Sequence, residues 1–191
     1  MKSLVSTLTG SLPLSLAEAK NHLRVGHNED DAAIESLIAA GIDEFERRTG
    51  RAFSEVSCVL SLDEFPDGAI YLPRPPVTEV TEISYRDSAG VHVLDELLWY
   101  ASIGASPAVV IPALDTSWPV TDGRADCVVI TYRAGILDKF PPLIRNALLI
   151  WLDLEFHEHD DRTAERMRRR IESVLRIVQL QHPRLAGITV K

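Results

Sequence analysis

Two stretches near the start of the chain decide the fold: residues 15–24, SLAEAKNHLR, and residues 30–49, DDAAIESLIAAGIDEFERRT. In the first, Ser15 can cap a helix and Glu18 completes a capping box. The second has acidic residues at its start and arginines at its end, which suit the helix dipole, and Gly50 is a natural residue to follow a helix. Apolar side chains recur at helical spacing, at Leu16, Ala19 and Leu23 and again at Ile34, Leu37, Ile38, Ile42 and Phe45. The sequence therefore predicts two helices, each with an apolar stripe that a later segment must cover.

Two later segments have the same helical character. Residues 142–156 begin within the proline pair Pro141 and Pro142, which suits the first turn of a helix, and are apolar over most of the circumference. We therefore expect a helix buried on more than one side that covers the first two. Residues 164–178 have an apolar stripe and many arginines, and Pro183 lies beyond them. They predict a fourth helix.

Between these helical pairs the pattern changes to period two, which is typical of strands. The expected strands are short and separated by turn residues: 56–62, 70–72, 77–85, 91–93, 99–100, 108–111 and 125–132. Such a series favours an antiparallel sandwich or a small barrel.

The predicted fold class is α+β, a discontinuous helical bundle with an inserted antiparallel β domain. The bundle comprises residues 15–50 plus 139–178, and the β domain comprises residues 51–136. Residues 1–14 are expected to be an extended arm that a partner or neighbouring subunit holds, and residues 179–191 a short extended tail.

Charge is distributed unevenly along the 191 residues. The formal net charge is −8, from 20 basic and 28 acidic residues, which disfavours a general nucleic-acid binder. Residues 161–191, however, contain eight basic and three acidic side chains. A basic end on an acidic body suggests that this end has a partner of its own.

Other features of the sequence limit the function classes further. Cys58 and Cys127 form neither a disulfide framework nor a zinc pattern, and we expect both to be buried apolar residues. No apolar run approaches the length of a membrane span, and residues 1–6 are too weakly apolar for a signal peptide. We expect a soluble protein with no membrane contact.

One cluster of potential metal ligands stands out, at His157, Glu158, His159, Asp160 and Asp161. On a helix, His157 and His159 would point about 200° apart. We therefore expect a solvated helix end and no metal site or cofactor there. No nucleophile elbow and no phosphate-binding loop occurs in the chain, so we assign no catalytic residues.

The arginine-rich segment 164–178 allows three interpretations. It is a solvated basic face, a helix that docks on an acidic protein surface, or a contact for nucleic-acid phosphates. For docking, the candidate residues combine arginines with part of the apolar stripe: Arg166, Arg169, Arg170, Ile171, Leu175, Arg176 and Val178.

A family resemblance connects these features. Residues 14–25 (LSLAEAKNHLRV), 29–40 (EDDAAIESLIAA) and 46–51 (ERRTGR) resemble the opening of tailed-phage head–tail connector, or adaptor, proteins. The later motifs resemble the long, β-containing branch of that family, which occurs in prophages and gene transfer particles: LPRPPV at 72–77, VTEI at 80–83, VITYRAG at 129–135 and PPLIRNA at 141–147. Taken in order, these motifs extend the resemblance over residues 12–157.

This resemblance implies a structural role with no catalytic residues and no cofactor. Such adaptors form a ring, typically of twelve subunits, beneath the portal in the virion neck and continue the DNA channel toward the tail. The implied partners are further copies of the chain, the portal protein, a downstream tail or stopper protein, and DNA that passes without sequence-specific binding. The protein would be made in the host bacterial cytoplasm, and its C-terminal helix and tail would engage the portal.

The resemblance also gives a role to the acidic side chains of the first helical pair. Glu29, Asp30, Glu35, Asp43 and Glu46 become candidates for a subunit contact or a channel-facing surface. Deletion of residues 164–191 is expected to leave the body folded but to yield heads without tails. Two alternatives remain: a regulatory or packaging protein that binds DNA through residues 164–178, and a metal-dependent enzyme that uses residues 157–161.

Overall fold

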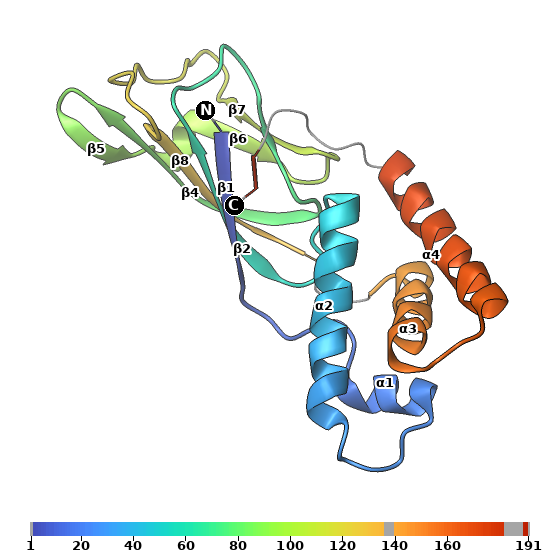
Figure 1. Cartoon of the computed structure of the whole chain (residues 1–191). Helices are drawn as coiled ribbons and strands as arrows, with labels where there is room; N and C mark the ends of the chain where they lie inside the picture. The colour runs from blue at the N-terminus through green and yellow to red at the C-terminus, as the bar shows by residue number, and fades with distance from the viewer. Residues whose placement is uncertain (1, 136–139, 182–188, 191) are drawn as a thin grey trace. The chain divides into compact units, whose positions relative to one another are not determined.

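The structure, a computed structural model, describes residues 2–135, 140–181 and 189–190 (Figure 1). The fold class is α+β, as the sequence predicts, with four α-helices and two sheets in the described residues. The chain divides into two compact units. Residues 11–54 and 136–183 make the helical unit, and residues 1–10, 55–135 and 184–191 make the β unit.

The helical unit contains α1 (Leu16–Leu23), α2 (Asp31–Thr49), α3 (Pro142–Phe156) and α4 (Asp161–Gln181). The predicted caps are present. Ser15 Oγ accepts a hydrogen bond of 3.3 Å from the Glu18 backbone N–H at the start of α1. Gly50 ends α2 with φ 71°, a left-handed conformation that glycine adopts without steric cost.

One apolar core holds the helical unit together. Ile34, Ile38 and Phe45 of α2 are buried in it together with Leu148 and Leu152 of α3, which confirms that α3 covers the N-terminal pair. Four side chains of α4 join the same core: Ile171, Val174, Leu175 and Val178. The helices approach closely at Gly41, where an added Cβ would lie 2.7 Å from Leu148 Cδ1 and from Trp151 Cε3.

In the β unit, the larger sheet has six strands in the order β5-β4-β8-β2-β1-β9. Their bounds are Lys2–Leu8 for β1, Val56–Leu62 for β2, Val77–Asp87 for β4, Gly90–Val93 for β5, Val128–Ala134 for β8 and Thr189–Val190 for β9. Neighbouring strands are antiparallel except β1 and β9, which are parallel. Four aligned side chains form one core row across the sheet, Leu4, Leu60, Ile130 and Ile83, and each is at most 1% exposed.

The smaller sheet of the β unit has the order β3-β7-β6. Its strands are β3 (Ile70–Leu72), β6 (Trp99–Ser102), which follows the short 3-10 helix Glu96–Leu98, and β7 (Ala108–Pro112). Burial alternates along β3 and β7, so this sheet also has one buried face. The buried Tyr132 hydroxyl of β8 donates a hydrogen bond of 2.9 Å to the Pro73 carbonyl just beyond β3.

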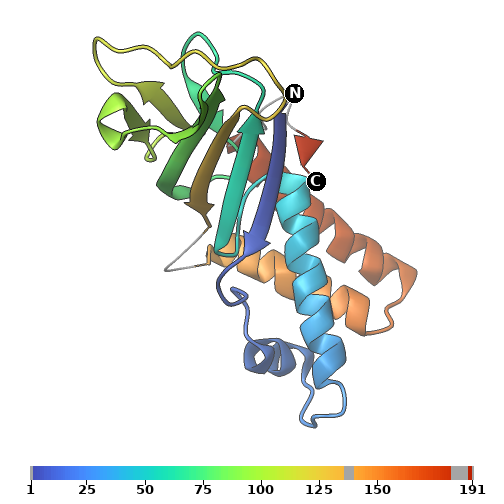
Figure 2. The same ribbon diagram turned by 90° about the vertical axis from the view of Figure 1, so that its left-hand side faces the viewer.

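The prediction for the N-terminus needs correction. Residues 2–8 are not an arm that awaits a partner, because β1 pairs along its whole length with β2 of the same chain (Figure 2). The apolar Leu4 belongs to the core row and supplies the physical reason for this pairing. Because the β unit also includes residues before α1 and after α4, it is more than an insertion between two helical halves.

Two other predicted segments differ at their ends. The last long strand begins at Val128 instead of residue 125, because Asp126 has φ 55° and the Cys127 thiol turns toward Asp122 Oδ1, 2.7 Å away. Helix α4 is longer than predicted, and Asp160 Oδ1 accepts the Thr163 backbone N–H at its start. Of the expected tail 179–191, α4 takes the first three residues and β9 takes two, while residues 182–188 and 191 lie outside the described residues.

Candidate functional site: the arginine face of helix α4

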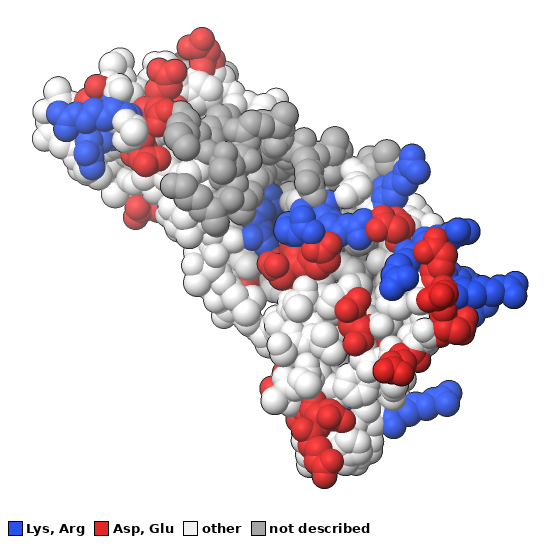
Figure 3. All heavy atoms as spheres, viewed as in Figure 1, with Lys and Arg blue, Asp and Glu red and all other residues white. Residues whose placement is uncertain are grey.

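Helix α4 places most of its apolar side chains on one side and most of its arginines on the other, with the exposed Ile177 among the arginines. We call the basic side the arginine face: Arg162, Arg166, Arg169, Arg170 and Arg176, all of them exposed. At about 100° per residue these positions fall within one side of the helix, opposite Ile171 and Val178. Lys and Arg side chains gather over α4 in the space-filling view, with Asp and Glu beside them (Figure 3).

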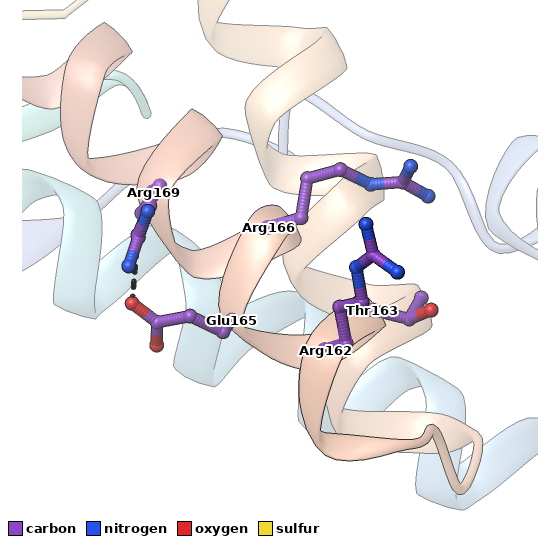
Figure 4. Close-up of a pocket in the computed structure, with 5 residues that line it drawn as sticks. All are labelled: Arg162, Thr163, Glu165, Arg166 and Arg169. Carbon is purple, nitrogen blue, oxygen red and sulfur yellow. Dashed lines mark hydrogen bonds and ion pairs between the residues drawn. The ribbon is translucent and has the colours of Figure 1, made fainter.

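Part of the arginine face surrounds an open hollow of about 560 Å³ (Figure 4). Its lining residues are Arg162, Thr163, Glu165, Arg166 and Arg169, all from the first turns of α4. Arg169 Nε donates a hydrogen bond of 2.8 Å to Glu165 Oε1. Guanidinium groups present several donors in a planar fork, so this surface suits carboxylates or phosphates.

Contacts with α2 determine which side of α4 faces outward. Arg48 Nη2 of α2 lies 2.6 and 2.5 Å from the two carboxylate oxygens of Glu172. The Gln179 side-chain amide donates to the Arg48 carbonyl at 2.6 Å. With these contacts at its edge and the apolar core beneath it, α4 keeps its arginines directed away from the core.

The prediction of which α4 residues dock on a partner is wrong for the three apolar residues. Ile171 is 4% exposed, Leu175 is 0% and Val178 is 6%. They belong to the core of the helical unit and are not available to a partner's groove. The same burial overturns the expectation that the body stays folded without residues 164–191, since that deletion removes four core side chains.

The acidic residues just before and within α2 that were predicted as a subunit contact have different surroundings in the structure. Glu29, Glu35 and Asp43 are exposed, and Asp30 is half-buried with its Oδ2 3.7 Å from His27 Nε2. Glu46 has a different role. Its Oε1 accepts the backbone N–H groups of Phe53 at 2.7 Å and Ser54 at 2.8 Å, so this carboxylate holds the segment after α2.

The relative orientation of His157 and His159 also differs from the sequence-based prediction. Helix α3 ends at Phe156, and His157 has extended backbone with φ −105° and ψ 151°, so the helical angle between His157 and His159 does not apply. His157 Nδ1 lies 2.7 Å from Asp153 Oδ1, and His159 Nε2 lies 3.8 Å from the same oxygen. The two histidines and Asp153 therefore converge.

One surface was missed by sequence reasoning, because the sequence does not say which face of a short strand is covered. The β unit exposes Val91 and Val93 on edge strand β5 and Tyr71, Tyr100 and Ile111 on the smaller sheet. Residues 108–111 (AVVI) are all apolar, so the sequence has no alternation there that would mark an outward side.

Cys58 and Cys127 are both buried thiols, as predicted. Burial raises the pKa of the Cys127 thiol, and so does its hydrogen bond to Asp122. Among the described residues, none of the helices combines the length and apolar character needed to cross a membrane.

Part of the chain is similar to a known protein family. Residues 13–89 match the model of the phage gp6-like head-tail connector family. This match confirms the resemblance to head–tail connectors that the sequence indicates. Comparison with curated proteins gives no match.

Solved structures extend the similarity over most of the chain. A chain from a virion of a native gene transfer agent (GTA) particle is 26% identical, with a TM-score of 0.65, over 82% of this chain and 86% of that one. A chain from the neck of an empty GTA particle computed with C6 symmetry is also 26% identical, with a TM-score of 0.64, over 81% and 85%. A chain from the neck of a native GTA particle computed with C12 symmetry shares the fold, with a TM-score of 0.69 over 95% of this chain and 97% of that one at 23% identity.

Proposed function

We propose that this chain is a structural head–tail adaptor of a tailed phage, prophage or gene transfer particle. In this role it forms a ring, of twelve subunits, beneath the portal in the virion neck and extends the DNA channel toward the tail. The observation that carries the proposal is the similarity to chains of GTA particles at 26% identity over more than four fifths of both chains. The family match at residues 13–89 supports it independently.

The arginine face is the proposed contact with the portal. The charge is concentrated in Arg166, Arg169, Arg170 and Arg176, on a chain whose net charge is −8. Because the apolar side of α4 is buried in its own unit, the contact is electrostatic and the complementary portal surface is acidic.

Contacts between copies of the chain are proposed at two places. The exposed acidic residues Glu29, Glu35 and Asp43, with Asp30 beside them, form one candidate or else face the channel. The exposed apolar side chains of the β unit form the other, since such groups mark interaction surfaces and a ring buries them against its next copy. Glu46 is removed from this set because it binds the backbone of its own chain.

The remaining features are consistent with this role. DNA passes through the ring without sequence-specific binding, as an acidic body requires. A tail or stopper protein binds below. Within the β unit we propose that the two sheets pack as a sandwich, because each has one buried face and Tyr132 of one reaches Pro73 beside the other.

A binding experiment with the cognate portal ring tests the adaptor role. The test variant replaces Arg166, Arg169, Arg170 and Arg176 with Gln, and a matched control replaces the exposed arginines of the β unit, Arg124 and Arg133. Mass photometry of wild-type chain with the portal should show a ring bound to the portal. The test variant should lose about a thousandfold in affinity if each of the four charged contacts is worth about 1 kcal/mol, and the control should bind normally.

Two results would oppose the proposal. Wild-type chain that ignores the portal ring removes the adaptor role, and undiminished binding by the test variant removes the arginine face from the contact. Salt-dependent binding of duplex DNA by the free chain, lost in the test variant, would instead favour a DNA-binding role.

A further inference from the structure

A set of metal-ligating side chains lies at the end of α3, apart from the arginine face. Asp153 comes from the last turn of α3, and His157 and His159 come from the segment that leads into α4. One ligand atom of each residue lies within 4.8 Å of the other two. It is the one such group of three among the residues that the structure describes. We propose that these three residues bind a divalent transition-metal ion, with zinc as the reference ion.

The two distances from Asp153 fit a small cation after minor adjustment. Zinc bonds of about 2.0–2.1 Å at tetrahedral angles place two ligand atoms about 3.3 Å apart. Asp153 Oδ1 is 2.7 Å from His157 Nδ1 and 3.8 Å from His159 Nε2. Shifts of about half an ångström bring both pairs to that spacing. The two histidine nitrogens lie within 4.8 Å of each other and approach by up to about 1.5 Å to reach it.

The existing hydrogen bonds do not prevent this adjustment. His159 Nε2 lies 3.0 Å from the Asp153 carbonyl, a contact that it gives up when it binds a metal. That carbonyl keeps the hydrogen bond of 3.1 Å from the His157 backbone N–H that caps α3. No backbone group at this helix end loses its last partner, so the cost of the exchange is small.

The ligand types select the class of metal. Two imidazoles with one carboxylate suit zinc, cobalt, nickel and copper, whereas magnesium and calcium prefer oxygen ligands. Three protein ligands leave a fourth position for water or for a side chain of another molecule. The site is accessible, since the side chains of Asp153, His157 and His159 are 31%, 41% and 19% exposed.

Bound metal would join the last turn of α3 to the segment before α4. Backbone that is otherwise held by the capping hydrogen bond from His157 and by two hydrogen bonds to Asp160 would become fixed by a three-ligand site. The expected consequence is a more rigid α3–α4 connection. This inference does not depend on the adaptor role.

Calorimetric titration of the full chain, freed of metals with a chelator, tests the proposal. Zinc chloride should bind with a stoichiometry of one, while magnesium and calcium should give no heat. Zinc at a hundredfold excess over its dissociation constant should raise the melting temperature by about 5–10 °C. Cobalt in place of zinc should produce the visible absorption of a site with nitrogen and oxygen ligands.

Substitutions of the proposed ligands test which side chains bind the metal. His159→Gln and Asp153→Asn should each weaken zinc binding by at least about tenfold, because even residues that only orient a metal ligand matter by about 10–100-fold. His27→Gln is the matched control, since His27 also lies beside an aspartate, at 3.7 Å, but outside the cluster. Far-UV circular dichroism confirms that each variant is folded.

Two outcomes would overturn the inference. One is wild-type chain that shows neither heat nor a cobalt spectrum at millimolar metal. The other is zinc binding that His159→Gln and Asp153→Asn leave unchanged, which would place the ion elsewhere on the chain.

Discussion

The helical unit and the β unit place their apolar side chains differently. Of the fourteen large hydrophobic side chains that are exposed among the described residues, twelve belong to the β unit. The two in the helical unit are Leu143 and Ile177. The outer surface of α4 consists mostly of the arginine face and its acidic neighbours, with Ile177 exposed among them.

This difference teaches how one chain can serve two kinds of contact. Burial of an exposed apolar surface lowers the free energy most when another surface covers it permanently, as between subunits of a ring. A charged surface instead makes the binding of a partner more specific and its association faster. In the proposed adaptor, the β unit binds further copies and the helical unit recognises the portal. Five predictions test this comparison, from the largest expected effect to the smallest.

Leu148→Ala should cause the largest loss of stability. Leu148 is fully buried where α3 meets α2, and such truncations cost about 2–5 kcal/mol. Leu143→Ala, on the same helix but 48% exposed, should change the free energy of unfolding by less than about 0.5 kcal/mol. Urea unfolding measures both, and equal losses would contradict the assignment of the core.

Gly41→Val should destabilise the helical unit by about 1–3 kcal/mol. Its new Cβ would lie 2.7 Å from Leu148 and Trp151, and the buried Leu148 has no solvent to move into. Ala40→Val, at an exposed position of the same helix, has only the cost of helix propensity, a few tenths of a kcal/mol. A stabilised Gly41→Val variant in thermal unfolding would disprove the close approach of α2 and α3.

Tyr132→Phe tests the core of the β unit and should cost about 1–2 kcal/mol. The change removes the buried hydroxyl that donates to the Pro73 carbonyl and leaves that acceptor without this donor. Tyr100→Phe, at a side chain that is 61% exposed, is the control and should have no effect. Chemical denaturation compares the two, and a neutral Tyr132→Phe would mean that the carbonyl finds another donor.

The double change Val91→Thr and Val93→Thr should barely alter stability but should weaken self-association. Both side chains are about two-thirds exposed on edge strand β5, so the folded chain loses little. The same change at the buried Val110 and Val128 should unfold the unit, because it places hydroxyl groups in the core. Analytical ultracentrifugation in the presence of the portal ring measures assembly, and normal rings from the Val91 and Val93 variant would move the subunit contact away from β5.

The smallest expected effect is a loosening of the β4–β5 turn in acid. A hydrogen bond of 2.7 Å from the Ala89 backbone N–H holds the pKa of Asp87 below its usual range, with further contributions from His92 and Gly90. Because the folded pKa is depressed, the stabilisation is complete above the usual value of about 4 and is lost as pH falls through the folded pKa.

Amide shifts of Ala89 and Gly90 in an NMR pH titration report this turn. Their midpoint should lie below about 3.9, the ordinary aspartate value. Asp87→Asn should abolish the acid titration while keeping one acceptor oxygen. A wild-type midpoint at or above the ordinary value would show that the turn hydrogen bonds do not stabilise the carboxylate.

Local signals in the sequence were enough for the helices. Ser15, Gly50 and the proline pair at the start of α3 define helix ends by interactions within a few residues. The apolar stripes also predict that α3 covers α1 and α2, because stripes of this size must be buried. Four strands of the larger sheet, β2, β4, β5 and β8, were likewise found by their alternation.

Contacts between segments that are distant in the sequence could not be predicted from local patterns. Nothing within residues 2–8 says that they pair with β2, about fifty residues later in the chain, and β9 joins β1 from the other end of the chain. Glu46 has the helical position of a surface residue, yet a later loop returns to bind it. His157 and His159 converge only because α3 ends one residue before His157, and element ends are the part of a prediction that local patterns define least well.

An image of the particle neck at side-chain resolution tests the central claim most directly. We predict twelve copies of this chain in a ring against the portal, with the arginine face at the portal contact and the exposed side chains of β5 or the smaller sheet covered by the next copy. A neck without this chain, or a ring whose arginine face points away from the portal, would contradict the account.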